Sequence, residues 1–188
     1  MTFESVISVC LGVGLAAAVG FRVFIPLLAL SLASYFNLLE LNTSWQWLGQ
    51  TSAMIVFSVA TIMEILGYLI PYLDNLLDTI AIPLAGIAGT IVMASTIGDF
   101  SPVISWALAI IAGGGTAAAI AGSASSARLT STTVTAGVGN SVVSIVETLT
   151  SILLAAFSIF LPVLAVVLVA LLIFLIFKFY KKFKSNRT

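Results

Sequence analysis

Four charged residues of this chain lie inside or beside long apolar segments: Arg22, Glu64, Arg128 and Glu147. They stand out because the whole sequence of 188 residues contains only seven acidic and seven basic side chains. A bilayer interior tolerates a charge only when it is paired, hydrated or functional, so each of the four is a candidate site residue. Two arginines and two glutamates also sum to zero, which predicts that they neutralise one another.

Composition sets the class of the fold. Hydrophobic residues make up 61% of the chain and charged residues 7%, against roughly 45–50% and 25% in soluble domains. Apolar runs of about 20 residues are long enough to cross a bilayer as helices, and continuous runs of this length do not suit the strands of a barrel. The sequence therefore predicts an all-α membrane protein that forms a single polytopic domain over residues 1–188.

The apolar segments predict about six transmembrane helices and two broken or re-entrant segments. The first broken segment follows Arg22 within the apolar stretch 5–33, where we expect a helix to about Gly20 and a half-helix from about Phe21. The second, residues 123–140, is rich in Ser, Thr, Ala and Gly and contains the other arginine. The remaining spans are expected at residues 52–71, 79–97, 103–122, 142–161 and 163–179.

An internal repeat joins these features. Residues 12–22 and 113–128 each combine glycines, a run of three alanines and a closing arginine. Each is followed by an irregular segment and then by a span with one glutamate, which predicts two inverted repeats at about 5–98 and about 100–180. In transporters built this way the site lies at the repeat interface near the bilayer midplane. The small residues also recur every four positions, which is typical of closely packed membrane helices.

The basic residues indicate the orientation. Five of the seven fall in the tail, residues 178–188, and they are Lys178, Lys181, Lys182, Lys184 and Arg187. By the positive-inside rule this end is cytoplasmic, and six crossings place both termini on that side. The plasma (inner) membrane is the expected location. A patch that binds lipid headgroups is an alternative interpretation of the tail.

The four buried charges are predicted to form a central substrate- or ion-binding site. A guanidinium group stays charged and offers a fork of donors to a carboxylate or a phosphate. A glutamate at membrane depth with polar neighbours is a candidate proton carrier. An ion pair that only stabilises the fold, between either arginine and Glu64 or Glu147, remains an alternative.

Further polar residues extend this predicted site. Asn140 and Ser144 share a helical face with the second glutamate and complete the expected binding set. Tyr68, Asp74 and Asp78 are secondary candidates. Tyr68 lies one helical turn beyond the first glutamate, and the two aspartates are four residues apart. Asp74 fits equally well as an ordinary helix N-cap.

These residues predict a small secondary transporter or channel for a small anion or a proton-coupled solute. A translocase for a phosphate-headed lipid and a non-transporting scaffold or assembly protein stay open as alternatives. No enzyme is expected, because no nucleophile with a neighbouring base is evident. No metal or cofactor is expected in a chain with no histidine and the single cysteine Cys10. The expected partners are the lipid bilayer and a small solute or lipid headgroup; nucleic acid is not among them, and homo-oligomerisation stays open.

One motif is similar to a known family pattern. Residues 20–27 read Gly-Phe-Arg-Val-Phe-Ile-Pro-Leu, which fits Gly-x-Arg-x-Phe-x-Pro-Leu. Over most of its length the chain resembles a family of bacterial and plant membrane proteins known as domain of unknown function 4126. The family has no assigned activity, so the resemblance supports the choice of site residues and not a substrate. It also includes, further along the chain, Glu64, Pro71, Asp74, Arg128 and the stretch 140–147.

Overall fold

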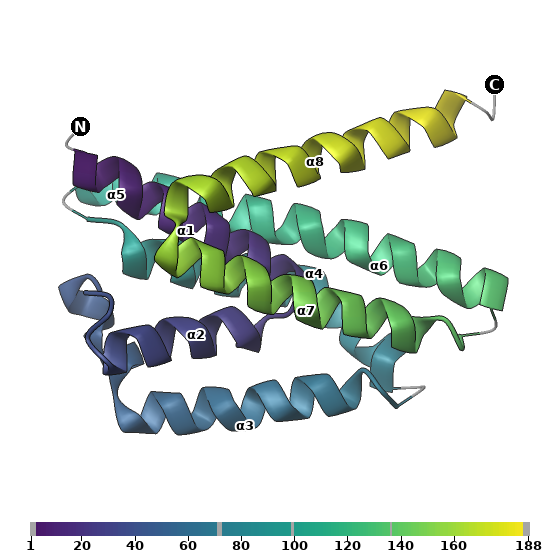
Figure 1. The fold of residues 1–188 in the computed structure, drawn as a ribbon, viewed down its shortest axis with the longest axis horizontal. Helices are drawn as coiled ribbons and strands as arrows, with labels where there is room; N and C mark the ends of the chain where they lie inside the picture. The colour runs from purple at the N-terminus through teal and green to yellow at the C-terminus, as the bar shows by residue number, and fades with distance from the viewer. Residues whose placement is uncertain (1–2, 71–72, 99, 136, 186–188) are drawn as a thin grey trace.

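A computed structural model describes residues 3–70, 73–98, 100–135 and 137–185. Pro71 and Arg187, named above, lie outside these ranges. Every regular element within them is helical (Figure 1), so the predicted all-α fold is confirmed. In chain order the elements are α1 (Phe3–Phe21), α2 (Phe24–Tyr35), the 3₁₀ helix η1 (Thr43–Gly49), α3 (Thr51–Gly67), α4 (Leu73–Thr96), α5 (Pro102–Leu108), the π-helical η2 (Ala109–Gly114), α6 (Gly115–Thr135), α7 (Asn140–Phe160) and α8 (Pro162–Ser185).

Much of the outside of this bundle is apolar, and five charged side chains are buried inside it. Helices α3, α7 and α8 all expose large hydrophobic side chains, including Ile55, Val59, Ile62, Val142, Leu149, Leu153, Val167 and Leu171. A continuous exposed apolar surface of this kind marks contact with a membrane or a partner rather than with water. The arrangement is compatible with a multi-pass membrane protein.

The expected number of six spans is neither confirmed nor contradicted by helix length and composition. Among the described residues, four helical stretches are long and apolar enough to cross a membrane. Helices η1 and α3 meet at 62° and supply a fifth span if they are counted as one bent element. Two further apolar helices, Phe24–Tyr35 and Pro162–Lys178, are shorter.

Helix α1 is the centre of the bundle. Its residues 11–20 are almost all buried, and it packs against α4, α6, α7 and α8. Small residues make this close contact sterically allowed. A Cβ atom on Gly12 would lie 2.3 Å from Met93 Sδ, and one on Gly20 would lie 2.6 Å from Ile120 Cβ. Gly12 and Gly20 therefore set how near α4 and α6 approach α1.

The first expected break is confirmed. Helix α1 ends at Phe21 and α2 begins at Phe24, so Arg22 and Val23 form the connection. Helix α2 has 12 residues, about 18 Å at 1.5 Å per residue, which is too short to cross a bilayer of about 30 Å. It turns back and packs alongside α3 and α7 (Figure 1). The break thus brings Arg22 into the interior of the bundle.

The second expected break is wrong. Residues 123–135 are the continuation of α6, and Arg128 lies within that helix rather than at its end. The hydroxyl groups explain why a segment rich in Ser and Thr stays helical. Ser123 and Ser126 donate hydrogen bonds to the carbonyl oxygens four residues earlier, at 2.9 and 2.8 Å, so they satisfy themselves inside the helix. The two halves of the chain are therefore not matched at their arginines.

The helices run back and forth along the long axis of the molecule. Figure 1 places the start of α1 and the end of α8 at opposite ends of that axis.

The packing of α1 predicts a difference between two glycine substitutions. Gly20→Ala should lower the free energy of unfolding by about 1–3 kcal/mol, because the new methyl group meets Ile120 and the carbonyl oxygen of Ala117 at 2.8 Å. Gly115→Ala is the matched control, since no atom lies within 4 Å of its Cβ position. Thermal unfolding in detergent micelles, followed by tryptophan fluorescence, measures both. Equal melting temperatures for the two variants would contradict this account of the α1–α6 contact.

Candidate functional site

Six charged side chains converge in the interior from the α1–α2 connection and from four helices. They are Arg22 of the connection, Glu64 of α3, Asp74 and Asp78 of α4, Arg128 of α6 and Glu147 of α7. All except Asp78 are buried, with Arg22 only 1% exposed. Helical spacing explains the inward direction on α4, where the two aspartates are one turn apart. We call these six residues the charge cluster.

Arg128 is the hub of the charge cluster. Its Nε and Nη2 atoms donate to the two carboxylate oxygens of Glu147, Nε at 3.2 Å. Its Nη1 atom donates to Asp78 Oδ1 at 2.7 Å and to Asp74 Oδ1 at 3.4 Å. The guanidinium group is therefore engaged by three carboxylates at once, and the bidentate pair is the strongest form of such a contact. Arg128 ties α4, α6 and α7 together.

Arg22 is held differently. Its Nε atom donates to Thr148 Oγ1 at 3.1 Å, and its Nη2 atom donates to the carbonyl and hydroxyl oxygens of Ser144 at 3.0 and 2.6 Å. Its ion pair with Glu147 is longer, 3.8 Å from Nη2 to Oε2. The Nη1 atom is buried and has no hydrogen-bond partner. Arg22 is thus anchored mainly by neutral groups of α7.

Glu64 caps the half-helix α2. Its two carboxylate oxygens accept hydrogen bonds from the backbone N–H groups of Val23, at 2.8 Å, and Phe24, at 3.0 Å. Residue Val23, at the N-cap position, supplies no side-chain cap of its own. The first N–H groups of a helix have no partner within it and carry partial positive charge, so a carboxylate there is stabilising. Of the two glutamates expected to pair with Arg22, Glu64 instead binds backbone.

Tyr68 and Asn140 complete the polar centre. The ring centroid of Tyr68 lies 4.0 Å from the guanidinium carbon of Arg22 and 3.9 Å from that of Arg128. An aromatic ring attracts cations over its face. Asn140 donates to Asp74 Oδ2 at 3.0 Å and to Thr132 Oγ1 at 2.9 Å. The tyrosine thus contacts both cations, while the asparagine orients one aspartate.

All nine residues singled out from the sequence lie in or against this cluster. Three contributors were not predicted from the sequence: Thr148, Thr132 and the backbone N–H groups that Glu64 caps. Thr148 carried a signal, because it is four residues beyond Ser144 and shares its helical face. Thr132 carried none, since it lies within the stretch that was expected to be irregular.

The charge balance of the cluster is uneven. Two guanidinium groups face four carboxylates, which leaves a formal charge of −2 when all six are ionised. Three of the acids surround Arg128, so this guanidinium occupies the centre where a bound cation would otherwise sit. Within the described residues, no group of three or more acidic or cysteine side chains is arranged to hold a metal ion.

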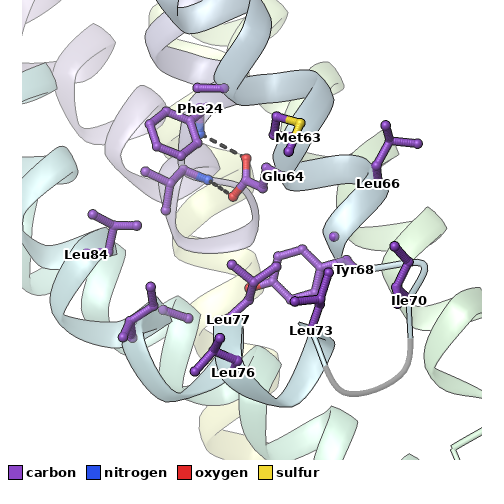
Figure 2. Close-up of a pocket in the computed structure, with 15 residues that line it drawn as sticks. Phe24, Met63, Glu64, Leu66, Tyr68, Ile70, Leu73, Leu76, Leu77 and Leu84 are labelled. Carbon is purple, nitrogen blue, oxygen red and sulfur yellow. Dashed lines mark hydrogen bonds between the residues drawn. The ribbon is translucent and has the colours of Figure 1, made fainter.

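An apolar cleft reaches the cluster from between α3 and α4. It has a volume of about 570 Å³ and extends to the start of α2. Figure 2 shows Glu64 and Tyr68 within it, with the two hydrogen bonds of Glu64 to the α2 backbone. The rest of its described lining is hydrophobic or glycine, including Met63, Leu66, Leu73, Leu76, Leu77 and Leu84. We call it the α3–α4 cleft.

The contacts of the two arginines predict unequal losses on substitution. Arg128→Gln should lower the free energy of unfolding by about 3–5 kcal/mol, because it leaves three buried acids without their cation. Arg22→Gln should cost less, about 1–3 kcal/mol, since its loss breaks mainly hydrogen bonds to neutral groups. Thermal unfolding of each variant in micelles gives the order. A larger loss for Arg22→Gln would show that Arg128 is not the hub.

The cap on α2 predicts that three glutamate variants differ in stability. Glu64→Ala should lower the free energy of unfolding by about 1–3 kcal/mol for each N–H group left unpaired, at Val23 and Phe24. Glu64→Gln keeps one acceptor oxygen and should lose less. Glu40→Ala is the control, because Glu40 is exposed and outside the cluster. If Glu64→Ala and Glu40→Ala melt together, the carboxylate does not stabilise α2.

Comparison with curated proteins and with solved structures finds no match. The family model described as Domain of unknown function (DUF4126) matches residues 9–182. This region includes every residue of the charge cluster and of the α3–α4 cleft. The resemblance inferred from the motif at residues 20–27 is thereby confirmed, and the chain belongs to the DUF4126 family.

Proposed function

We propose that this protein is a small proton-coupled secondary transporter and that the charge cluster is its coupling site. The observation that carries the proposal is the excess of carboxylates over guanidinium groups inside an apolar bundle. A buried charge without a partner is costly. A cluster with two surplus acids therefore lowers its energy by holding a proton or by attracting a cation.

The cluster also lies where coupling requires it. Its ion pairs join the two halves of the chain: Arg22 pairs with Glu147, and Arg128 pairs with Asp74 and Asp78. Protonation of a carboxylate at such a junction weakens a contact between the halves. In transporters whose two halves move against each other, the site between the halves is the pivot of alternating access. This supports a transporter over a channel.

The charges argue against the other solutes considered. A small anion or a lipid phosphate needs free guanidinium donors. Three carboxylates occupy Arg128, and of Arg22 only Nη1 lacks a partner. The charged group that lines the α3–α4 cleft is Glu64, which repels a phosphate. A scaffold role accounts for the ion pairs and for the helix cap at Glu64, but it leaves three carboxylates facing the two guanidinium groups.

We propose the plasma (inner) membrane as the location, with the basic end of the chain in the cytoplasm. The support is the cluster of basic residues after position 177, which the positive-inside rule assigns to the cytoplasmic face. The opposite ends of α1 and α8 in Figure 1 then favour an N-terminus on the other face.

Proton movement in proteoliposomes tests the transporter proposal. We expect an imposed pH gradient to collapse when a transported solute is added from a panel of monocations, anions and neutral compounds, with a pH-sensitive dye as the readout. Asp78→Asn should slow this collapse at least tenfold, because Asp78 is the more exposed acid of the hub, 18% against 9% for Asp74. Glu40→Gln removes an exposed carboxylate outside the cluster and should leave the rate unchanged.

Two outcomes would overturn the proposal. One is a wild-type protein that gives no more proton movement than empty liposomes for every solute in the panel. The other is an Asp78→Asn variant that transports at the wild-type rate. Either outcome, with the fold intact, would favour a purely structural role for the charge cluster.

A further inference from the structure

The lining of the α3–α4 cleft indicates which kind of ligand would bind there, because it is mostly apolar and yet includes one carboxylate. We propose that this cleft binds a lipophilic monocation, with Glu64 as the counter-charge. The inference rests on the proposed transporter function, and it names lipophilic monocations as the class of solute that the transporter moves.

The carboxylate of Glu64 has capacity left for a ligand. A carboxylate has about four acceptor positions on its two oxygens. The N–H groups of Val23 and Phe24 use one position on each oxygen. The side chain lines the cleft while its carboxylate binds the start of α2 (Figure 2). A cation in the cleft can therefore approach Glu64 without displacing it from α2.

The positive charge of the proposed ligand follows from the charges around the cleft. No Lys or Arg lines the cleft in the part of the chain that the structure describes. Without Glu64, the rest of the charge cluster has two guanidinium groups and three carboxylates, a formal charge of −1 when fully ionised, so its field also favours a cation. Phe24 adds an aromatic ring to the lining, as Figure 2 shows. Aromatic faces stabilise cations, most strongly where water is absent.

The apolar character of the ligand follows from the rest of the lining. Small-molecule sites measure about 300–1,000 Å³ and are mostly hydrophobic with few polar groups. The cleft has about 570 Å³ and fits that description. An acyl chain of a lipid would also contact these side chains, but it offers no charge to the carboxylate of Glu64, whose polar partners are the two N–H groups of α2. A hydrophobic body with one positive charge satisfies both parts of the lining.

Two probes of the same shape and opposite charge test the sign. Radiolabelled tetraphenylphosphonium should bind the full-length protein in detergent micelles saturably, at about one site per chain, by equilibrium dialysis. Tetraphenylborate should not compete with it. Saturable tetraphenylborate binding at the same site, or no saturable tetraphenylphosphonium binding, would overturn the inference.

Substitutions locate the binding site. Glu64→Gln should weaken tetraphenylphosphonium binding at least tenfold, and Glu40→Gln should not. Because Glu64 also caps α2, a second variant tests the cleft without touching the carboxylate: Ala81→Trp fills the cleft and should weaken binding at least tenfold. Ala107→Trp is its control, since Ala107 is exposed on α5 and away from the cleft lining. Wild-type affinity in Ala81→Trp would refute the site, as would wild-type affinity in a folded Glu64→Gln variant.

Binding and transport fail in distinguishable ways. Saturable tetraphenylphosphonium binding that depends on Glu64, without any proton movement in liposomes, would support the ligand site and contradict the transporter proposal. Solute-driven proton movement without tetraphenylphosphonium binding would support the transporter proposal and contradict a lipophilic cation as its substrate.

Discussion

The compensation of buried charge at Arg128 is the interaction on which the rest of this structure depends. One guanidinium group holds carboxylates from α4 and α7 against α6. In an apolar interior, removing one partner leaves the others as uncompensated charges, which is far more costly than the pair was favourable. The same constraint explains Glu64, whose carboxylate is balanced by the positive end of α2 rather than by an arginine. Each buried charge is therefore a link between helices, and the links converge on one region.

Small residues make that convergence sterically allowed. Helix α1 is the central element, and its glycines let α4 and α6 come near enough for side chains from several helices to meet. The same close packing recurs between α4 and η2, where a Cβ atom on Gly113 would lie 2.6 Å from the carbonyl oxygen of Gly89. Since α1 stops at Phe21, the chain delivers Arg22 into the interior at the point where α2 turns back. Packing and charge placement are thus two results of one helix arrangement.

The cluster and the cleft together relate structure to the proposed activity. The hub is saturated by its own carboxylates, while Glu64 is shared between the α2 backbone and the cleft. A ligand or proton that changes the charge at Glu64 therefore also changes the capping of α2. Helix α2 in turn packs against α3 and α7. A local change in charge at the cleft is in this way coupled to helices of both halves.

From the sequence alone came the helical fold, the break near Arg22, the prediction of a membrane protein and the nine polar residues that the structure brings together. These follow from hydropathy, periodicity and the high cost of charge in hydrocarbon, which are read locally. The tertiary structure alone decided which partner each residue has. Arg22 bonds to Thr148, 126 positions away, and Glu64 bonds to Val23, 41 positions away, and local patterns carry no signal for such distances. It also decided that residues 123–135 stay helical and that a cleft opens between α3 and α4. The cleft depends on how α3 and α4 pack, whereas small hydroxylated residues suit a helix and an irregular segment equally well until their hydroxyl groups bind carbonyl oxygens of the same helix.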